Sequence, residues 1–164
     1  MQAIPALTLN TNDKMPLLGL GVYKSVEAGY RLIDTASVYK NEDGVGRAVK
    51  AASIPREDLF ITTKVWNTAQ RLGSVESAFS RSLERLQMDY VDLYLIHWPV
   101  PGCYLDTWKD LEKIYADGRA RAIGVSNFDI PQLEALFENS GIVPAVNQIE
   151  YPPLWNQSEL RAYC

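Results

Sequence analysis

The sequence predicts an α/β protein in which parallel strands alternate with helices around a barrel. Short apolar runs alternate along the chain with segments of helical period. The strand candidates recur every 23 to 33 residues, which is the length of one strand-helix unit and implies right-handed parallel crossovers. Ionisable side chains lie at or just past the C-terminal ends of three successive strand candidates, the rim where such barrels carry their chemistry.

The strand candidates are short and largely apolar, as expected of parallel strands buried on both faces. In chain order they are residues 17–21, 31–35, 59–64, 91–96, 121–126 and 145–149. Before the first of them, residues 8–16 predict a small hairpin with its turn at Asn12 and Asp13. We expect this hairpin to cover one end of the sheet.

Helix candidates lie between the strands, each beginning after a polar residue that is able to cap its first turn. They follow Asn41, Ser74, Thr107 and Asp129, and a last helix begins near Asn156. Thr107 and Asp110 form a variant of the capping box, and Gly118 is expected to end the third helix.

Two features do not fit a complete barrel. Only nine residues, 22–30, separate the first two strands, whereas a parallel crossover with its helix needs roughly 10 to 12 or more. Six strands are visible, whereas a closed (β/α)8 barrel needs eight, and the missing two would leave two long apolar edges. We therefore expect these residues to be part of a longer protein, and an intact mass of 18.4 kDa would reject that idea.

Composition and charge exclude several functional classes. Of the 164 residues, 47% are hydrophobic and 22% are charged, as in an ordinary globular protein. The net charge of -4, without a concentrated basic patch, argues against nucleic acids and anionic membranes as partners. Cys103 and Cys164 lack metal-ligand spacing, and neither a signal peptide nor a run of ~18 apolar residues is present. We expect one domain, residues 1–164, in a cytoplasmic monomer.

Four ionisable side chains form the candidate catalytic site, namely Asp34, Tyr39, Lys64 and His97, the only histidine. Lys64 ends an apolar strand and cannot easily reach solvent, so it needs a carboxylate partner, for which Asp34 is well placed. A purely structural ion pair explains these two residues equally well. Beside a buried ammonium, the phenol of Tyr39 would have a lowered pKa and become a usable proton donor. By itself it would be an ordinary exposed loop tyrosine.

Further polar and aromatic residues lie near the same rim. His97 precedes Trp98 and could orient a substrate carbonyl, although a lone histidine is more often a packed core or surface residue. Ser126, Asn127 and Gln148 could hold a flat amide such as nicotinamide, or they could cap helices and bond to backbone. Tyr23, Trp66 and Trp98 could wall a pocket for a small apolar carbonyl compound.

Other chemistries match the sequence poorly. With one histidine and two distant cysteines, a zinc site would depend on carboxylates, so we expect no metal. The sequence contains no GxSxG, GxxxxGK[ST] or GxGxxG motif. A hydrolase elbow, a P-loop and a Rossmann-type cofactor site are therefore all excluded.

Six segments, in order, resemble the signature segments of the aldo-keto reductases, and most closely the soluble reductases related to prostaglandin F synthase and 2,5-diketogluconate reductase. They are GLGVYKS, EAGYRLIDTASVYKNEDGVG, PREDLFITTKVWN, YVDLYLIHWPVP, RARAIGVSNF and VNQIEYPPLWNQ. The resemblance implies a TIM barrel that reduces aldehydes and ketones by hydride transfer from NADPH.

The resemblance also implies a role for each candidate residue. Tyr39 would donate the proton, Lys64 and Asp34 would tune it, and His97 would orient the carbonyl. The nicotinamide carboxamide would be held by Asp34, Ser126, Asn127 and Gln148.

The chain also departs from the family pattern. Part of the first helix is absent, and Pro152 stands where relatives often have histidine. The segments that bind the cofactor's phosphates in the family are not among the 164 residues. The 164 residues by themselves are therefore expected to bind NADPH weakly. Two alternatives stay open, namely a cofactor-binding relative without catalysis, such as a channel subunit or a crystallin, and an inactive truncated form.

Overall fold

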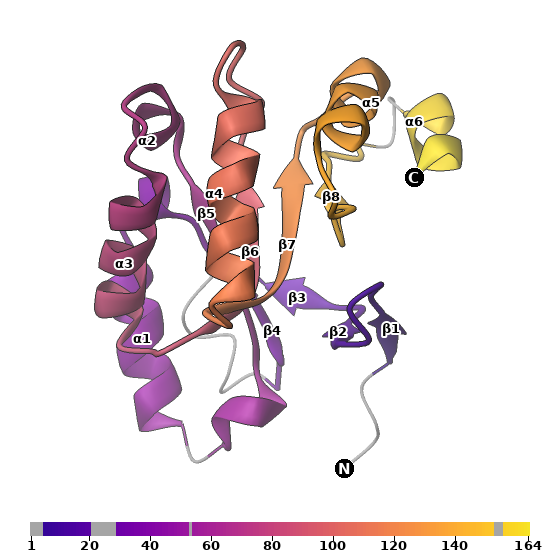
Figure 1. Cartoon of the computed structure of the whole chain (residues 1–164). Helices are drawn as coiled ribbons and strands as arrows, with labels where there is room; N and C mark the ends of the chain where they lie inside the picture. The colour runs from indigo at the N-terminus through magenta and orange to yellow at the C-terminus, as the bar shows by residue number, and fades with distance from the viewer. Residues whose placement is uncertain (1–4, 21–28, 53, 153–155) are drawn as a thin grey trace.

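A computed structural model describes residues 5–20, 29–52, 54–152 and 156–164. Six parallel strands form one curled sheet, in the same order as they occur along the chain (Figure 1). They are β3 (Gly19–Leu20), β4 (Leu32–Asp34), β5 (Phe60–Val65), β6 (Val91–Ile96), β7 (Ala120–Ser126) and β8 (Asn147–Gln148). Sequential order arises when every right-handed crossover winds in the same direction, as in a barrel. The predicted α/β class with six of eight strands is confirmed.

Helices cover the outer face of this sheet, one after most of the strands (Figure 1). The longer ones are α1 (Glu42–Ala51), α3 (Val75–Leu86), α4 (Tyr104–Ala116) and α5 (Ile130–Asn139). The short ones are α2 (Asn67–Arg71), α6 (Ser158–Tyr163) and the 3-10 turns η2 (Ser37–Tyr39) and η3 (Arg56–Asp58). The sequence did not predict α2 or the two turns, because none of them has an apolar stripe of helical period.

Two apolar layers hold the sheet, one on each face. The outer layer packs strands against helices and contains Ile61, Tyr94 and Trp108. The inner layer contains Phe60, Leu93, Leu95 and Ala122. The two sets alternate along each strand because successive side chains point to opposite faces.

The N-terminal hairpin covers the lower opening of the curled sheet, as predicted. Its strands β1 (Ala6–Thr8) and β2 (Lys14–Pro16) pair antiparallel. Asn12 takes the left-handed conformation in the turn, with φ of 69°, which asparagine tolerates better than most residues. Leu9 is buried in the inner layer and so joins the hairpin to the strands.

Helix capping differs from the prediction at three of four sites. Asp129 caps α5 through a complete capping box, accepting from the Gln132 amide at 2.9 Å. Asn41 and Ser74 stand at N-cap positions, but neither caps its helix. The side-chain oxygen of Asn41 instead accepts from the Thr35 hydroxyl at 2.6 Å.

The prediction that Thr107 caps the third helix is wrong. The helix α4 begins three residues earlier, at Tyr104, and Thr107 is buried within its first turns. The left-handed turn at Gly102, with φ of 73°, directs the chain into the helix sooner than the capping pattern indicated. Gly118 has a φ of 72° just after the helix, so its predicted role at the C-terminus is confirmed.

The last edge strand is shorter than expected. The sequence predicted a five-residue strand at 145–149, but β8 has two residues and so offers few unpaired backbone groups. At the other edge, the described part of the strand predicted at 17–21 is Gly19–Leu20. The last helix starts at Ser158, two residues from the predicted Asn156.

The parallel pairing of the first two strands is confirmed, with Gly19 opposite Leu32. Most of the connection between them lies outside the described residues. Among the described helices, none is both long and apolar enough to cross a membrane.

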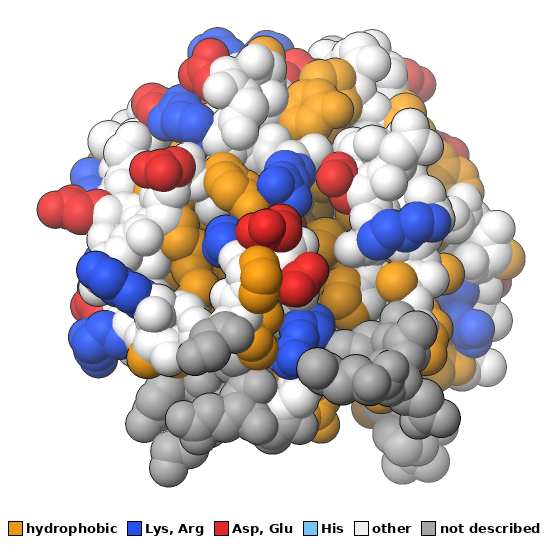
Figure 2. Space-filling model, turned by 90° about the horizontal axis from the view of Figure 1, so that it is seen from below, with side chains coloured by type: hydrophobic (Ala, Val, Ile, Leu, Met, Phe, Trp, Pro, Cys, Tyr) orange, Lys and Arg blue, Asp and Glu red, His pale blue; other side chains and the backbone are white. Residues whose placement is uncertain are grey.

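An ion network closes the N-terminal ends of the strands. Figure 2 shows this lower face, where charged side chains of both signs gather among apolar ones. The buried Asp92 accepts from Arg56 at 2.6 Å and from the backbone amide of Ile61 at 2.9 Å. Arg56 and Arg121 each lie 4.3 Å from the ring centroid of Tyr90. Burial raises the pKa of Asp92, although the charges of Arg56 and Arg121 oppose this effect. The network lies at the end of the sheet opposite the rim that carries the candidate site.

Candidate active site

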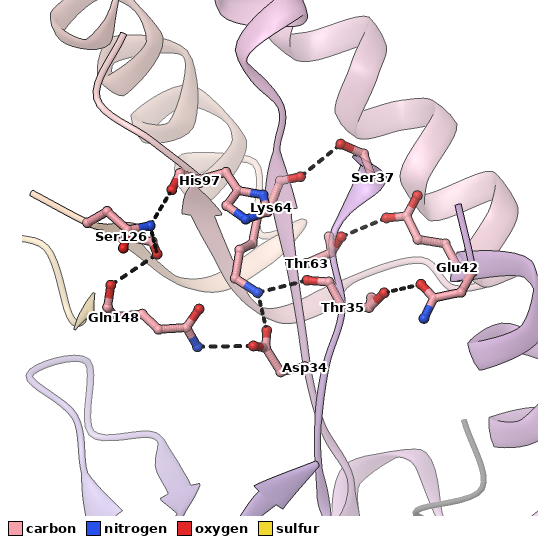
Figure 3. A network of polar contacts seen from close by, with 11 residues as sticks. Asp34, Thr35, Ser37, Glu42, Thr63, Lys64, His97, Ser126 and Gln148 are labelled. Atoms are coloured by element: carbon pink, nitrogen blue, oxygen red, sulfur yellow. Dashed lines mark hydrogen bonds and ion pairs between the residues drawn. The ribbon is translucent and has the colours of Figure 1, made fainter. Parts of the chain in front are cut away.

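Five polar side chains meet at the C-terminal rim of the sheet because of their positions along the strands. Asp34, Ser126 and Gln148 are the last residues of β4, β7 and β8. Lys64 is the penultimate residue of β5, and His97 directly follows β6. Each lies an even number of residues beyond a member of the inner layer, so the pleat turns all five inward. Figure 3 shows them gathered around one centre.

Lys64 and Asp34 form the predicted ion pair. The Nζ atom of Lys64 donates to Asp34 at 2.5 Å and to the carbonyl oxygen of Thr35 at 3.1 Å. The lysine side chain is only 1% exposed, whereas that of Asp34 is 24% exposed. Burial lowers the pKa of Lys64, and Asp34 opposes this effect by favouring the charged ammonium. The pair is thus both a structural contact and a tuned titratable group.

Gln148 completes the environment of Asp34. Its side-chain amide donates to the second carboxylate oxygen of Asp34 at 3.1 Å. Lys64 and Gln148 therefore approach the same carboxylate from two strands that are far apart in the sequence (Figure 3). The carboxylate is held by two donors, which fixes its orientation.

His97 lies in an aromatic niche beside this pair. It is 8% exposed, and its ring meets those of Tyr39 and Trp66 edge-on, with centroid distances of 5.6 and 5.1 Å. Its buried Nδ1 atom has no hydrogen-bond partner among the described residues. Burial, with a further contribution from the Lys64 charge, lowers the pKa of His97 to about 4. The imidazole is therefore neutral near pH 7 and carries one N–H.

Tyr39 ends the turn η2, which the hydroxyl of Ser37 fastens to β5 by donating to the Lys64 carbonyl oxygen at 3.0 Å. The tyrosine is 49% exposed, and its ring centroid lies 5.5 Å from the Lys64 ammonium. The expected lowering of its pKa is wrong. Partial burial, and then the charge of Asp34, raise the pKa of Tyr39. Asp34 lies beside Lys64 and offsets the influence of the ammonium on the phenol.

Ser126 and Asn127 link the rim of β7 to its neighbours on both sides. The Ser126 hydroxyl donates to the backbone oxygen of Gln148 at 3.0 Å. The Asn127 amide nitrogen donates to the backbone oxygen of His97, also at 3.0 Å, while Asn127 has a φ of 63°. The predicted backbone bonds of these residues are thus present.

Two acceptors of this group remain free for a ligand. No hydrogen bond between described residues uses the side-chain oxygen of Asn127 or that of Gln148. A primary carboxamide has two N–H groups that need such acceptors. Asn127 and Gln148 therefore fit the flat amide that the sequence predicted for this position.

The aromatic residues predicted to wall the pocket are only partly placed. Trp66 is half-buried against His97, and Trp98 is 43% exposed just beyond it. Tyr23 lies outside the described residues. Beneath the rim, a cavity of about 290 Å³ extends from Asp34 and Gln148 toward the hairpin.

One functional support was missed in the sequence. Glu42, in the first turn of α1, is fully buried and accepts from Thr63 at 2.6 Å and from Arg85 at 2.6 and 2.8 Å. Figure 3 shows it on the far side of β5 from Lys64. Its spacing of three residues from the core residue Val45 was the available signal, because it puts Glu42 on the buried face.

Comparison with known sequences gives consistent matches. Residues 16–164 match the pattern of the aldo/keto reductase family. A glyoxal reductase of Bacillus subtilis is 51% identical over 169 residues, covering 95% of this chain and 61% of that protein. A methylglyoxal reductase of Yersinia pestis is 48% identical, with 97% and 62% covered. The chain thus spans about three fifths of the length of these curated relatives.

Solved structures give the same result. An aldo/keto reductase from Brucella melitensis superposes with a TM-score of 0.94 at 44% identity, covering 98% of this chain and 68% of that one. An aldo-keto reductase of Bombyx mori, solved in complex with NADP, has a TM-score of 0.93 at 38% identity. That match covers 100% of this chain and 64% of the silkworm protein.

Proposed function

Because the chain belongs to the aldo/keto reductase family, we propose that its rim is the proton-transfer part of a site that reduces aldehydes or ketones to alcohols with NADPH. The observation that carries this proposal is the buried Lys64–Asp34 pair beside Tyr39 and His97. A phenol, an ammonium and a neutral imidazole around one opening are suited to moving one proton and holding one oxygen atom.

Tyr39 is the proton donor in this proposal. Its raised pKa keeps the hydroxyl protonated near neutral pH, so a proton is available when negative charge develops on a carbonyl oxygen. The Lys64 ammonium, kept charged by Asp34, stabilises the phenolate that remains after the transfer. The Lys64–Asp34 pair therefore matters more for the phenolate that Tyr39 forms after proton transfer than for the pKa of Tyr39 before it.

His97 is the group that orients the carbonyl. Its lowered pKa keeps the imidazole neutral, so that it donates a hydrogen bond without competing with Tyr39 as an acid. The rings of Tyr39 and Trp66 restrict its rotation. The aromatic wall, with Trp98 at its outer end, suits a small apolar carbonyl compound.

NADPH, when bound, supplies the hydride of the reaction. We propose that Asn127 and Gln148 accept from its carboxamide and that Ser126 supports them, because their free oxygens fit that group. Gln148 also donates to Asp34, which would couple the position of the amide to the Lys64–Asp34 pair. The NADP complex of the silkworm relative supports this choice of cofactor.

The names of the relatives suggest glyoxal and methylglyoxal as first substrates to test. Both are small dicarbonyl compounds, and each offers an oxygen atom that can accept a hydrogen bond from His97. We further propose that the protein acts as a monomer in the cytoplasm.

The variant Tyr39→Phe tests the assignment. We expect kcat for methylglyoxal reduction to fall by about 10²–10⁴-fold, because the proton donor is lost, while NADPH affinity changes little. The measurement is NADPH oxidation followed by absorbance, together with a fluorescence titration of NADPH. Tyr163→Phe in α6 is the matched control and should leave kcat unchanged.

Full turnover in Tyr39→Phe would disprove the role of this residue. Saturable NADPH binding without turnover in the unmodified chain would instead favour a relative that binds cofactor but does not catalyse. No saturable NADPH binding at all would indicate that these residues do not form a working cofactor site without further sequence.

A further inference from the structure

A second hollow lies outside the rim, between the turn η2, the short helix α2 and the helix α3. Its volume is about 380 Å³, within the range of roughly 300–1,000 Å³ typical of small-molecule sites. Asp34, Lys64 and His97 do not line it. Trp66 lies between this hollow and the candidate active site. It lines the hollow, and its ring centroid lies 5.1 Å from that of His97.

The hollow, which we call the outer groove, has an apolar lining. Val38, Trp66 and Leu72 contribute to it. Leu72 is 73% exposed, the highest value among the large hydrophobic side chains that the structure describes as exposed. A single exposed leucine is ordinary, but here it stands at a concave site beside other apolar groups.

The charges around the outer groove are all positive. Lys40, Arg81 and Arg85 line it, and no carboxylate does. Arg85 is neutralised by Glu42 at 2.6 Å, whereas Lys40 and Arg81 form no ion pair with any described residue. Two uncompensated cations therefore flank an apolar hollow in a protein whose net charge is -4.

We propose that the outer groove binds a carboxylate that carries an apolar chain, such as a medium-chain fatty acid. Its carboxylate would contact Lys40 and Arg81 through charge-assisted hydrogen bonds, and its chain would cover Leu72 and Val38. The groove adjoins α3, which packs on the middle strand β5, so strands added at either sheet edge would not fill it (Figure 1).

Calorimetric titration with decanoate, below its micelle concentration, tests the proposal. We expect saturable binding that weakens at least tenfold in the double variant Lys40→Gln, Arg81→Gln. The matched control is Arg47→Gln, Lys50→Gln, which removes the same charge from exposed positions of α1 and should bind as the unmodified protein does. 1-Decanol should bind at least tenfold more weakly than decanoate, because it lacks the carboxylate.

Leu72→Asn provides a second, independent variant at an exposed position that should not affect folding. We expect it to weaken decanoate binding as well, with an unchanged circular dichroism spectrum. The proposal is overturned if decanoate does not bind, if both double variants bind it equally, or if decanol binds as tightly. Binding that survives all groove substitutions would mean that the ligand occupies another site.

Discussion

At the scale of single residues, the site combines one buried ion pair with one neutral imidazole. Lys64 is almost fully buried, and only Asp34 and a backbone oxygen balance its charge. His97, a few ångströms from aromatic rings, has lost much of its affinity for protons. Burial thus lowers the pKa of both residues.

The titration of His97 can be observed directly because the chain has one histidine. In an untagged protein, the imidazole C–H resonances followed by NMR should report a pKa of about 4, well below the usual value. The unfolded chain binds a proton near pH 6.5 but the folded one does not, so stability should fall as pH drops from about 6.5 toward 4. Between pH 7 and 5 this loss is about 2 kcal/mol. A pKa near 6.5 would contradict the burial argument.

Asp34→Asn should destabilise the protein strongly. Removing one partner of a buried pair leaves an uncompensated charge on Lys64, which typically costs about 3–5 kcal/mol. Urea unfolding at pH 7 measures the change, and Asp34→Asn combined with Lys64→Met should recover much of it. Asp110→Asn, which breaks a surface pair with Lys113, is the control and should cost less than about 1 kcal/mol. Equal costs for the two single variants would disprove the argument.

At the scale of elements, the helix α1 joins the strand that bears Lys64 to the helices of the outer layer. Glu42 in its first turn binds β5 through Thr63 and α3 through Arg85. One turn later, Gly46 allows α1 to approach the C-terminal end of α3 closely. A side-chain carbon at Gly46 would lie 2.4 Å from the carbonyl oxygen of Leu86. The position of α1, and therefore the contact of Glu42 with β5, depends on the lack of a side chain at Gly46.

Gly46→Ala should therefore destabilise the protein by about 1–3 kcal/mol, because the obstacle is backbone and cannot rotate away. Gly44→Ala, in the same helix, is a matched control. Its added carbon meets only the end of Arg47 at 3.9 Å, so the gain in helix propensity should stabilise by up to about 1 kcal/mol. Chemical unfolding of both variants gives the comparison. Equal effects of the two substitutions would show that the close approach is unimportant.

At the scale of the whole molecule, the sheet is strongest in its middle and weakest at its two ends. All residues of β5 and β6 are buried, and β7 has one exposed position. Within the described residues, β3 and β8 contain two residues each and pair with one neighbouring strand. Gln148, which holds Asp34, belongs to one of these edges.

Hydrogen exchange should follow this gradient. We expect the backbone amides of β5, β6 and β7 to exchange slowest and those of β3 and β8 to exchange much faster, because edge strands open locally. Mass spectrometry of peptides after timed exchange measures it. Protection of β8 equal to that of β6 would contradict the prediction.

Much of the fold could be predicted from local sequence patterns, namely apolar runs and capping residues. The strand bounds 91–96 agree with β6, and the capping residue Asp129 forms the full box that its sequence favours. The positions of Lys64, His97 and Ser126 at strand ends were enough to bring them to one rim. Local pattern failed where a polar group had a better distant partner, as for Asn41, which accepts from Thr35 and does not cap its helix.

Which ionisable groups reach the rim follows from the sequence alone, because a residue's place along its strand sets the direction and height of its side chain. The electrostatics of these groups follow only from the folded structure. The raised pKa of Tyr39 reflects Asp34 and partial burial together, and these depend on neighbours from separate strands. The same holds for the burial of Glu42 and the cations of the outer groove. Charge and burial depend on all surrounding residues, whereas the direction of a side chain depends mainly on its own strand.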